Sequence, residues 1–270
     1  MTPGAAGSEP WFPFGVPDLD APLRVFCLPY AGGGAGLYRS WQQRAAAGAA
    51  LAPVQLPGRE TRLREPPVED FETLVTRLAG ALGPWTGDRY ALFGHSMGGL
   101  LAHELAYRLE ELTGRPPELL AVSACAAPEL ERPRPAIHQL PREEFVAELR
   151  RLEGTPAEVL EDDELLDLCI PRIRADFAVL ASHRHRPRAP LNSRITAFCG
   201  TRDPQIPVWS MEAWRGHTTR DFRLHLMDDD HFFIHRHEAA VFQHLVDGVR
   251  AVLGDEAAGV TSRPDERTSR

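Results

Sequence analysis

The chain has 270 residues, a formal net charge of −8 and 43% hydrophobic residues, which suits one large domain or two small ones with a buried core. The negative charge argues against a general binder of nucleic acid or of anionic membranes. No apolar run approaches the length of a membrane span, and the N-terminus lacks the basic and apolar regions of a secretory signal. We expect a cytoplasmic protein that binds neither nucleic acid nor membrane, and a monomer.

Apolar and amphipathic runs alternate along the chain. Strands are predicted at Arg24–Leu28, Ala52–Leu56, Arg89–Phe93, Leu119–Ser123, Arg194–Cys199 and Phe222–Met227. Helices are predicted at Leu37–Ala46, Asp70–Leu82, Met97–Leu112, Pro207–Trp214 and His237–Leu253. This alternation predicts an α/β fold with a mostly parallel central sheet and helices on both faces.

One segment interrupts the alternation. Residues 135–190 contain helical patterns at Arg142–Leu152, Pro156–Leu160 and Asp163–His183 but no good strand. We interpret this helical insertion as a lid. It divides the α/β core into residues 21–134 and 191–254. Residues 1–20 are expected to form an arm or tail, and residues 255–270 a disordered C-terminal tail.

The cysteines are scattered without C-x-x-C spacing, and three of them lie in apolar, strand-like runs. Cysteine in such runs behaves as a small hydrophobic residue. We therefore expect buried free thiols in a reducing compartment rather than disulfides. The four positions are Cys27, Cys125, Cys169 and Cys199.

Ser96 lies in the sequence Gly94-His95-Ser96-Met97-Gly98, between a predicted strand and the predicted long helix. G-x-S-x-G in this context is the nucleophile turn of α/β hydrolases. The turn is too tight for side chains at its two glycines, and it pushes the serine hydroxyl out above the sheet. A structural turn serine is the alternative, but the flanking strand and helix favour a catalytic one. The start of the helix also presents the Met97 N–H to an anion.

A serine hydroxyl is a weak nucleophile, so it needs a base that is oriented by a carboxylate. Asp203 follows the fifth predicted strand, and His231 follows the sixth. Because the carboxyl ends of parallel strands share one edge of a sheet, both loops should converge on Ser96. The competing acids Asp228 to Asp230 directly precede the histidine, would fold back onto its ring with difficulty, and are interpreted as a solvated turn.

Other histidines have simpler interpretations. His95, inside the turn, should pack or form a local hydrogen bond. His235 and His237 follow His231 closely, but no cysteine or carboxylate spacing of a recognised metal site accompanies them. We predict no metal and no cofactor.

Residues 29–36 read PYAGGGAG, a glycine-rich turn of the kind that holds phosphate. The dinucleotide fingerprint needs glycines at positions one, three and six, but the sixth falls on Leu37 or Arg39 here, and the Gly-Lys-Ser/Thr of a P-loop is missing. An α/β hydrolase instead needs a second oxyanion donor from the loop after an early strand. We therefore predict that the backbone N–H groups of Ala31 and Met97 form an oxyanion hole.

Five segments in order resemble the type II (external, editing) thioesterases of polyketide synthases and nonribosomal peptide synthetases: FCLPYAGGGAGLYRSW, VQLPGRE, FGHSMGGLLAHELA, FCGTRDPQIP and DDDHFFI. The similarity spans about residues 22 to 252. It implies the α/β-hydrolase fold and a helical lid over a substrate channel. The sequence departs from the resemblance at Asp229-Asp230, where relatives often carry glycine. The matching site positions are the triad Ser96, Asp203 and His231 and the oxyanion-hole amides of Ala31 and Met97.

The resemblance also implies an activity: hydrolysis of acyl thioesters on the phosphopantetheine arm of an acyl or peptidyl carrier protein. Such enzymes clear stalled or wrongly primed carriers during antibiotic biosynthesis. Two alternatives stay open, a free-standing carboxylesterase or lipase acting on small esters, and a hydrolase-like binding module without catalysis.

Docking of an acidic carrier protein onto this acidic chain would need a local basic patch. Scattered, solvated arginines are the alternative interpretation of the candidates. These are Arg172, Arg174, Arg184, Arg186 and Arg188 in or beside the insertion, and Arg59, Arg62 and Arg64 elsewhere.

Overall fold

The computed structural model describes residues 9–44, 48–130, 136–152, 154–155 and 157–259. Within these residues six strands form one sheet of order β2-β1-β3-β4-β5-β6, and every neighbouring pair is parallel. The predicted parallel sheet is therefore confirmed. The strands are β1 (Leu23–Leu28), β2 (Ala49–Pro53), β3 (Tyr90–His95), β4 (Leu119–Ser123), β5 (Arg194–Gly200) and β6 (Phe222–Met227).

Strand β2 lies three residues earlier than its predicted range, Ala52–Leu56. The Val54 N–H still donates to the Cys27 carbonyl at 2.9 Å, but the Gln55 N–H turns to the carbonyl of Trp11. Val54 thus keeps its contact with β1, while the N-terminal segment bonds the outer edge of the chain just beyond the strand.

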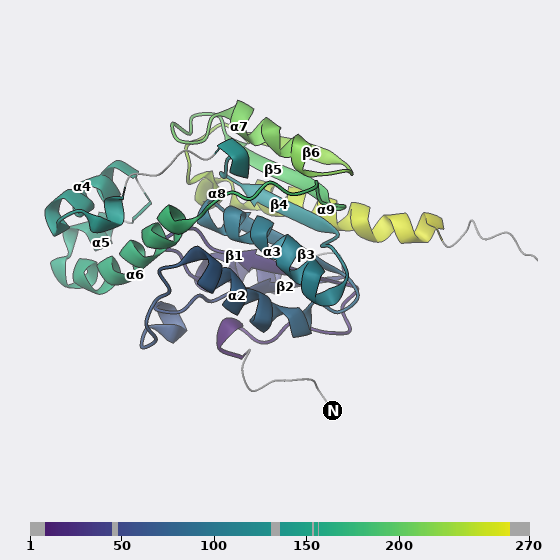
Figure 1. Cartoon of the computed structure of the whole chain (residues 1–270), viewed down its shortest axis with the longest axis horizontal. Coiled ribbons are helices and arrows are strands. Elements are labelled where there is room, and N and C mark those ends of the chain that lie inside the picture. Colours follow the sequence, from purple (N-terminus) through teal and green to yellow (C-terminus); the bar gives the residue numbers. More distant parts are fainter. Residues whose placement is uncertain (1–8, 45–47, 131–135, 153, 156, 260–270) are drawn as a thin grey trace, which may run out of the picture.

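Helices cover both faces of the sheet (Figure 1). Alternate residues of β1 point to opposite sides: Phe26 joins the core beneath α2 and α3, whereas Val25 and Cys27 join the core beneath α1 and α9. This alternation is what a strand buried on both faces requires. The helices are α1 (Arg39–Gln43), α2 (Phe71–Leu82), α3 (Met97–Thr113) and α9 (Glu238–Gly259).

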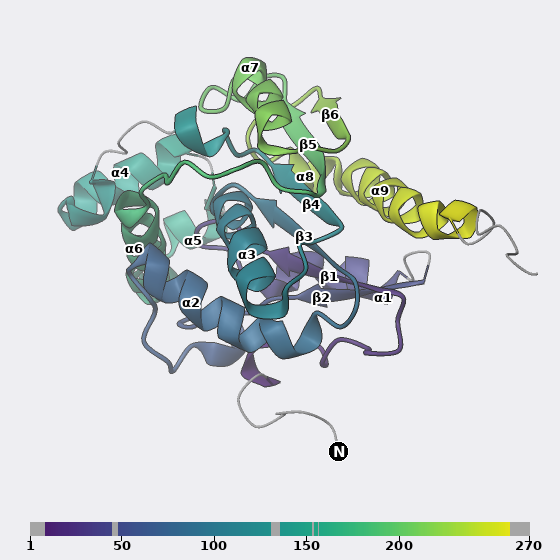
Figure 2. The ribbon, with the colours of Figure 1, turned by 45° about the vertical axis from the view of Figure 1, so that its right-hand side comes forward.

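The helical insertion comprises α4 (Arg142–Leu152), α5 (Ala157–Glu161) and α6 (Asp163–Ser182). Helices α4 and α5 lie beyond one end of the sheet, and α6 runs back from them toward it (Figures 1 and 2). These bounds agree with the predicted helices to within one residue, and Pro156 lies outside the described residues. The insertion has a small apolar core of its own, built on Phe145, Leu149, Cys169 and Ile173.

At the two ends of the chain, the structure describes residues 9–20 of the predicted arm and residues 255–259 of the predicted tail. In the predicted arm, Trp11 and Phe12 are buried, and the Phe12 ring lies 5.9 Å from that of Trp85. At the other end α9 continues to Gly259, so residues 255–259 belong to a helix rather than to a disordered tail. The rest of the predicted arm and tail, residues 1–8 and 260–270, lies outside the described part of the chain.

Two short helices, α7 (Val208–Glu212) and α8 (Phe233–Arg236), follow β5 and β6. Helix α7 ends earlier than the predicted Trp214, because the chain tightens into a 3₁₀ turn at Ala213–His217. Among the helices of the described residues, none combines the length and apolarity needed to cross a membrane.

The buried imidazole of His103, on α3, makes the fold sensitive to acid. Burial holds the pKa of His103 well below its usual value, since the charged ring would lose its hydration. The unfolded chain therefore binds more protons, and the free energy of unfolding should fall as pH drops below about 6.5, by up to about 1.4 kcal/mol per pH unit. Urea titrations between pH 7.5 and 5.5 should show a shallower decline for His103→Leu. An unchanged decline would contradict this assignment.

Candidate active site

Ser96 occupies a sharp turn between β3 and α3. Its φ of +53° is unusual for a residue with a side chain, and its N–H donates to the Ser123 carbonyl at 2.8 Å. A Cβ at Gly94 would lie 1.9 Å from the Gly98 carbonyl oxygen, and one at Gly98 would lie 2.3 Å from the Leu28 carbonyl oxygen. Only glycine fits at both positions, so the backbone itself forces the serine side chain outward.

Three side chains predicted to act together form one hydrogen-bonded chain. His231 Nε2 lies 3.0 Å from Ser96 Oγ, and His231 Nδ1 lies 2.6 Å from Asp203 Oδ2. The other Asp203 oxygen accepts the N–H groups of Gln205 and Ile206 at 2.8 and 3.1 Å. A carboxylate that accepts from Nδ1–H leaves Nε2 free to accept the serine proton. The Asp203 side chain is fully covered, so this orientation is held without competition from water.

The neighbouring acids make other contacts. Asp228 pairs with Arg202, and Asp229 receives the Nε–H of Arg236 at 2.6 Å. Asp230 also pairs with Arg236. The hydrogen bonds from Arg236 hold the pKa of Asp229 well below its usual range. The prediction of a solvated turn is therefore wrong for Asp229, which is only 4% exposed, because the short helix α8 folds an arginine back over it.

His95 positions the loop of His231, a role that the sequence did not reveal. Its ring is fully buried, with Nδ1 2.8 Å from Ser123 Oγ and Nε2 3.0 Å from the His231 carbonyl. Burial lowers the pKa of His95 well below its usual value, so the ring is neutral. It therefore donates to the carbonyl and accepts from the serine. The predicted local partner is in fact a backbone group 136 residues away along the chain.

The glycine-rich loop turns sharply beside Ser96. The Gly33 N–H donates to the Tyr30 carbonyl at 2.9 Å, and Gly32 adopts a φ of +83° that favours glycine. Ala31 lines a pocket together with Ser96 and His231. In the described part of the chain, no protein acceptor is recorded for the Ala31 N–H or for that of Met97. Both donors predicted for an oxyanion hole are thus available to a ligand.

Side chains from two distant segments hold this loop. The Gly32 N–H donates to Asp176 Oδ2 at 2.6 Å, the Ala35 N–H to Gln55 Oε1 at 3.2 Å, and the Gly36 N–H to Glu60 Oε2 at 3.2 Å. Gln55 and Glu60 belong to the VQLPGRE segment, whose position in the family resemblance was the only signal of their role. No feature of the sequence pointed to Asp176.

Two of the eight arginines proposed for a basic patch, Arg59 and Arg62, are buried. Arg59 is 2% and Arg62 is 8% exposed, and both are paired, with Asp176 and Glu65 respectively. Neither side chain can meet a partner protein. A guanidinium with bidentate carboxylate geometry is an internal structural contact of the kind that arginine suits.

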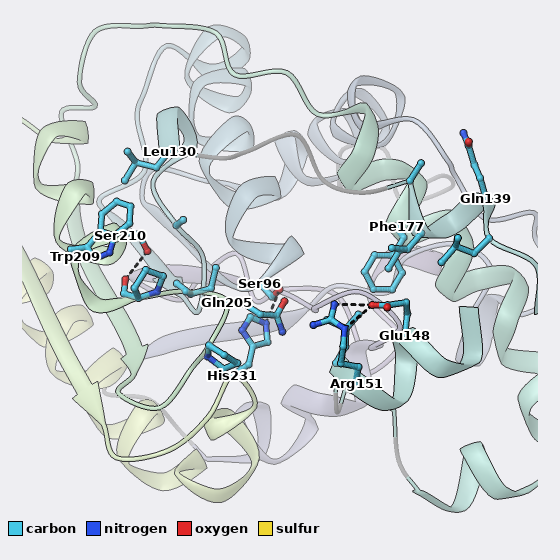
Figure 3. A pocket seen from close by; sticks show the side chains of 18 of the residues that line it. Ser96, Leu130, Gln139, Glu148, Arg151, Phe177, Gln205, Trp209, Ser210 and His231 are labelled. Atoms are coloured by element: carbon cyan, nitrogen blue, oxygen red, sulfur yellow. Dashed lines mark hydrogen bonds and ion pairs between the residues drawn. The ribbon is translucent and has the colours of Figure 1, made fainter. Parts of the chain in front are cut away.

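Ser96 and His231 open into a pocket of about 1000 Å³, between α7 and the helical insertion (Figure 3). Trp209 lies on the α7 side, and Glu148 and Arg151 lie on the insertion side. A second, smaller pocket of about 50 Å³ also reaches Ser96 and His231. Its apolar wall includes Leu149, Leu152, Ile173, Phe177, Leu180 and Phe232.

The insertion also contacts the histidine loop directly. A Cβ at Gly154, which precedes α5, would lie 2.4 Å from the Phe232 ring, next to His231. The backbone of the insertion therefore lies against the site and forms one of its walls. An activated serine, a base and two free N–H groups beside an apolar pocket have the chemistry for acyl transfer from an ester or thioester to serine, and then to water.

The chain is similar to known proteins over most of its length. The thioesterase domain family model matches residues 23–248. The chain is 36% identical over 249 residues to the thioesterase PikA5 of Streptomyces venezuelae, covering 92% of this chain and 88% of that one. It is 42% identical over 219 residues to the linear gramicidin dehydrogenase LgrE of Brevibacillus parabrevis, covering 80% and 83%.

A solved structure shares both fold and sequence. The type II thioesterase BorB of the borrelidin biosynthetic cluster superposes with a TM-score of 0.79 at 37% identity, over 87% of this chain and 96% of that one. With the parallel sheet, this likeness identifies the α/β-hydrolase fold. The family match covers most of the chain and includes the segments that carry Ser96, Asp203 and His231, and the chain accordingly belongs to the thioesterase family.

Proposed function

We propose that this chain is a type II, editing thioesterase that hydrolyses acyl thioesters on the phosphopantetheine arm of an acyl or peptidyl carrier protein. The observation that carries the proposal is the hydrogen-bonded chain Ser96–His231–Asp203 at a 1000 Å³ pocket, in a member of the thioesterase family. The likeness to a type II thioesterase from a biosynthetic cluster supports the editing role. The pathway context would be polyketide or nonribosomal peptide synthesis.

In the proposed mechanism, Ser96 Oγ attacks the thioester carbonyl carbon while His231 Nε2 takes the hydroxyl proton. The carbonyl oxygen becomes an oxyanion, which accepts hydrogen bonds from the N–H groups of Ala31 and Met97. The carbon–sulfur bond then breaks and the proton on His231 passes to the departing sulfur, leaving an acyl-serine, the carrier thiol and a neutral imidazole. Water, deprotonated by His231, attacks the acyl-serine, and the proton returns from His231 to Ser96 Oγ as the acid is released. Asp203 stabilises the imidazolium in both steps.

The thiol leaving group eases the first step. A thiol with a pKa of about 8.5 leaves as a thiolate more readily than an alcohol or amine would, so general-acid assistance matters less than it does in a protease. The helical insertion would act as a lid, because α4 and α6 provide one wall of the pocket. The pantetheine arm would enter through the larger pocket, and the acyl group would lie against Ile173 and Phe177 in the smaller one.

The dehydrogenase name of one relative does not carry over. Residues 32–37 lack the glycine spacing of the dinucleotide-binding fingerprint. The N–H groups of Gly32, Ala35 and Gly36 are already bound by side chains of this chain, so they offer no cradle to a pyrophosphate. Buried free thiols at all four cysteines fit a reducing cytoplasm, which is where we propose the enzyme acts.

The decisive experiment compares substrates. The purified chain should hydrolyse acetyl- or propionyl-carrier protein with a kcat/KM about a hundredfold or more above that for p-nitrophenyl acetate, since carrier and arm supply binding energy remote from the reacting bond. Release of free carrier thiol can be followed by intact-protein mass spectrometry. A preference for the aryl ester would favour a carboxylesterase. Binding of carrier without turnover of either substrate would favour a binding module.

A further inference from the structure

Arg59 and Asp176 form a fully buried ion pair whose location needs an explanation. Two parallel hydrogen bonds of 2.7 Å join the guanidinium to the carboxylate, and their side chains are 3% and 1% exposed. Arg59 follows β2, and Asp176 lies in α6 of the helical insertion. A buried pair of this kind is weak evidence for stability, because desolvation offsets much of the attraction between its charges. Its contacts indicate a different role.

Both members of the pair hold the glycine-rich loop. Asp176 Oδ2 accepts the Gly32 N–H at 2.6 Å, and Arg59 Nη1 donates to the Gly33 carbonyl at 3.0 Å. One carboxylate oxygen therefore bridges the loop backbone and the guanidinium. The loop is held on either side of Gly32, where φ is +83° and glycine offers little resistance of its own to rotation.

These hydrogen bonds to Gly32 and Gly33 also constrain the direction of the neighbouring amide, that of Ala31. The Tyr30 carbonyl and the Ala31 N–H belong to one trans peptide, so they point in opposite directions. The Tyr30 carbonyl accepts from the Gly33 N–H at 2.9 Å and is thereby directed into the turn. The Ala31 N–H then points away from the turn, and Ala31 is one of the residues that line the pocket beside Ser96. Contacts that fix the positions of Gly32 and Gly33 therefore also fix the orientation of the Ala31 N–H.

We propose that Arg59 and Asp176 are positioning residues that orient the Ala31 N–H toward the oxyanion. Because Asp176 lies on α6, this orientation depends on the position of α6 against the glycine-rich loop. The inference rests on the proposed function, because it assigns part of its transition-state stabilisation. A second observation supports the coupling: a Cβ added at Gly32 would lie 3.4 Å from Cγ1 of Ile173, one turn before Asp176 on α6. The helix that lines the acyl pocket thus lies beside the loop that receives the oxyanion.

The test measures transition-state stabilisation separately from binding and stability. Asp176→Asn keeps an acceptor for Gly32 but removes the charge that holds Arg59. We expect its kcat on acetyl-carrier protein to fall about 10- to 100-fold, a part of the 10²–10³ lost with a whole oxyanion donor, while KM changes by less than about threefold. Butylboronic acid, whose tetrahedral adduct on Ser96 places an oxygen in the hole, should bind weaker by a similar factor.

A matched control and a second variant keep the test decisive. Glu104→Gln weakens a less deeply buried ion pair, between Glu104 on α3 and Arg188, and it should leave kcat and boronate affinity near wild type. The double variant Arg59→Met/Asp176→Leu fills the same volume without buried charge, so it should stay folded and still lose kcat.

The outcomes separate this inference from the proposed function. If folded Asp176→Asn and the double variant both match wild type in kcat and boronate affinity, the pair does not position the Ala31 amide. A fall in thermal stability with an unchanged kcat would overturn the inference in the same way. If the wild-type chain itself fails to hydrolyse acyl-carrier protein, the proposed function fails instead.

Discussion

Replacing Ser96 with alanine should lower kcat on an acyl-carrier protein by about a million-fold, the scale seen when a nucleophile that acts as part of a triad is removed. The substitution deletes only the Oγ that lies 3.0 Å from His231 Nε2. The backbone at this position has a φ of +53° that serine and alanine tolerate alike, so the fold should persist. Single-turnover mass spectrometry of the carrier should detect neither acid release nor an acyl-enzyme.

Ser40→Ala provides the control for this experiment. Ser40 lies in α1, on the face of the sheet opposite α3, and its hydroxyl donates a hydrogen bond to Glu238 on α9. Loss of this contact should leave kcat within about twofold of wild type, because surface substitutions away from special features have small effects. Ser96→Ala retaining more than a thousandth of the wild-type rate would show that another group attacks the thioester.

Replacing Asp203 with asparagine should lower kcat by about 10⁴-fold while preserving the shape of the site. The carboxylate accepts the Nδ1–H of His231 at 2.6 Å and thereby keeps Nε2 unprotonated toward Ser96. An amide can instead donate to Nδ1, which moves the ring proton to Nε2 and removes the base. The loss should appear in both kcat and kcat/KM, and the rate of inactivation by a serine-directed fluorophosphonate should fall as well.

Asp229→Asn is the matched comparison, since Asp229 lies two residues before the same histidine. Its carboxylate pairs with Arg236 and makes no recorded contact with the His231 ring. We expect a modest loss of stability and a kcat within about tenfold of wild type. A larger loss of kcat for Asp229→Asn than for Asp203→Asn would assign the orienting acid to Asp229 instead.

The sequence predicted the parts of the site that local backbone geometry dictates. The turn around Ser96 could be predicted because two glycines at fixed spacing are required wherever a strand turns this sharply into a helix. The loops of Asp203 and His231 could be predicted because each follows a strand of recognisable length, and the ends of parallel strands meet at one edge.

Other features depend on contacts between distant side chains, which no local pattern encodes. Arg59 reads as a surface arginine in sequence, yet its partner Asp176 lies 117 residues away, in the middle of an amphipathic helix. His95 likewise bonds a carbonyl that only the folded chain brings near. Strand β2 was predicted three residues too late because Val54 and Leu56 are apolar and buried like strand residues, although they lie beyond the strand in the same core cluster as Trp11.

The contacts of Asp176 with Gly32 and of Gly154 with Phe232 have a consequence for protein engineering. Exchange of the helical insertion between relatives is an obvious route to altered acyl preference. In this chain the insertion cannot be transplanted as an independent module, because a foreign α6 without the aspartate would leave Arg59 buried and unpaired. A chimaera would need to carry the VQLPGRE segment and the glycine-rich loop together with the insertion. These three segments therefore have to be exchanged together.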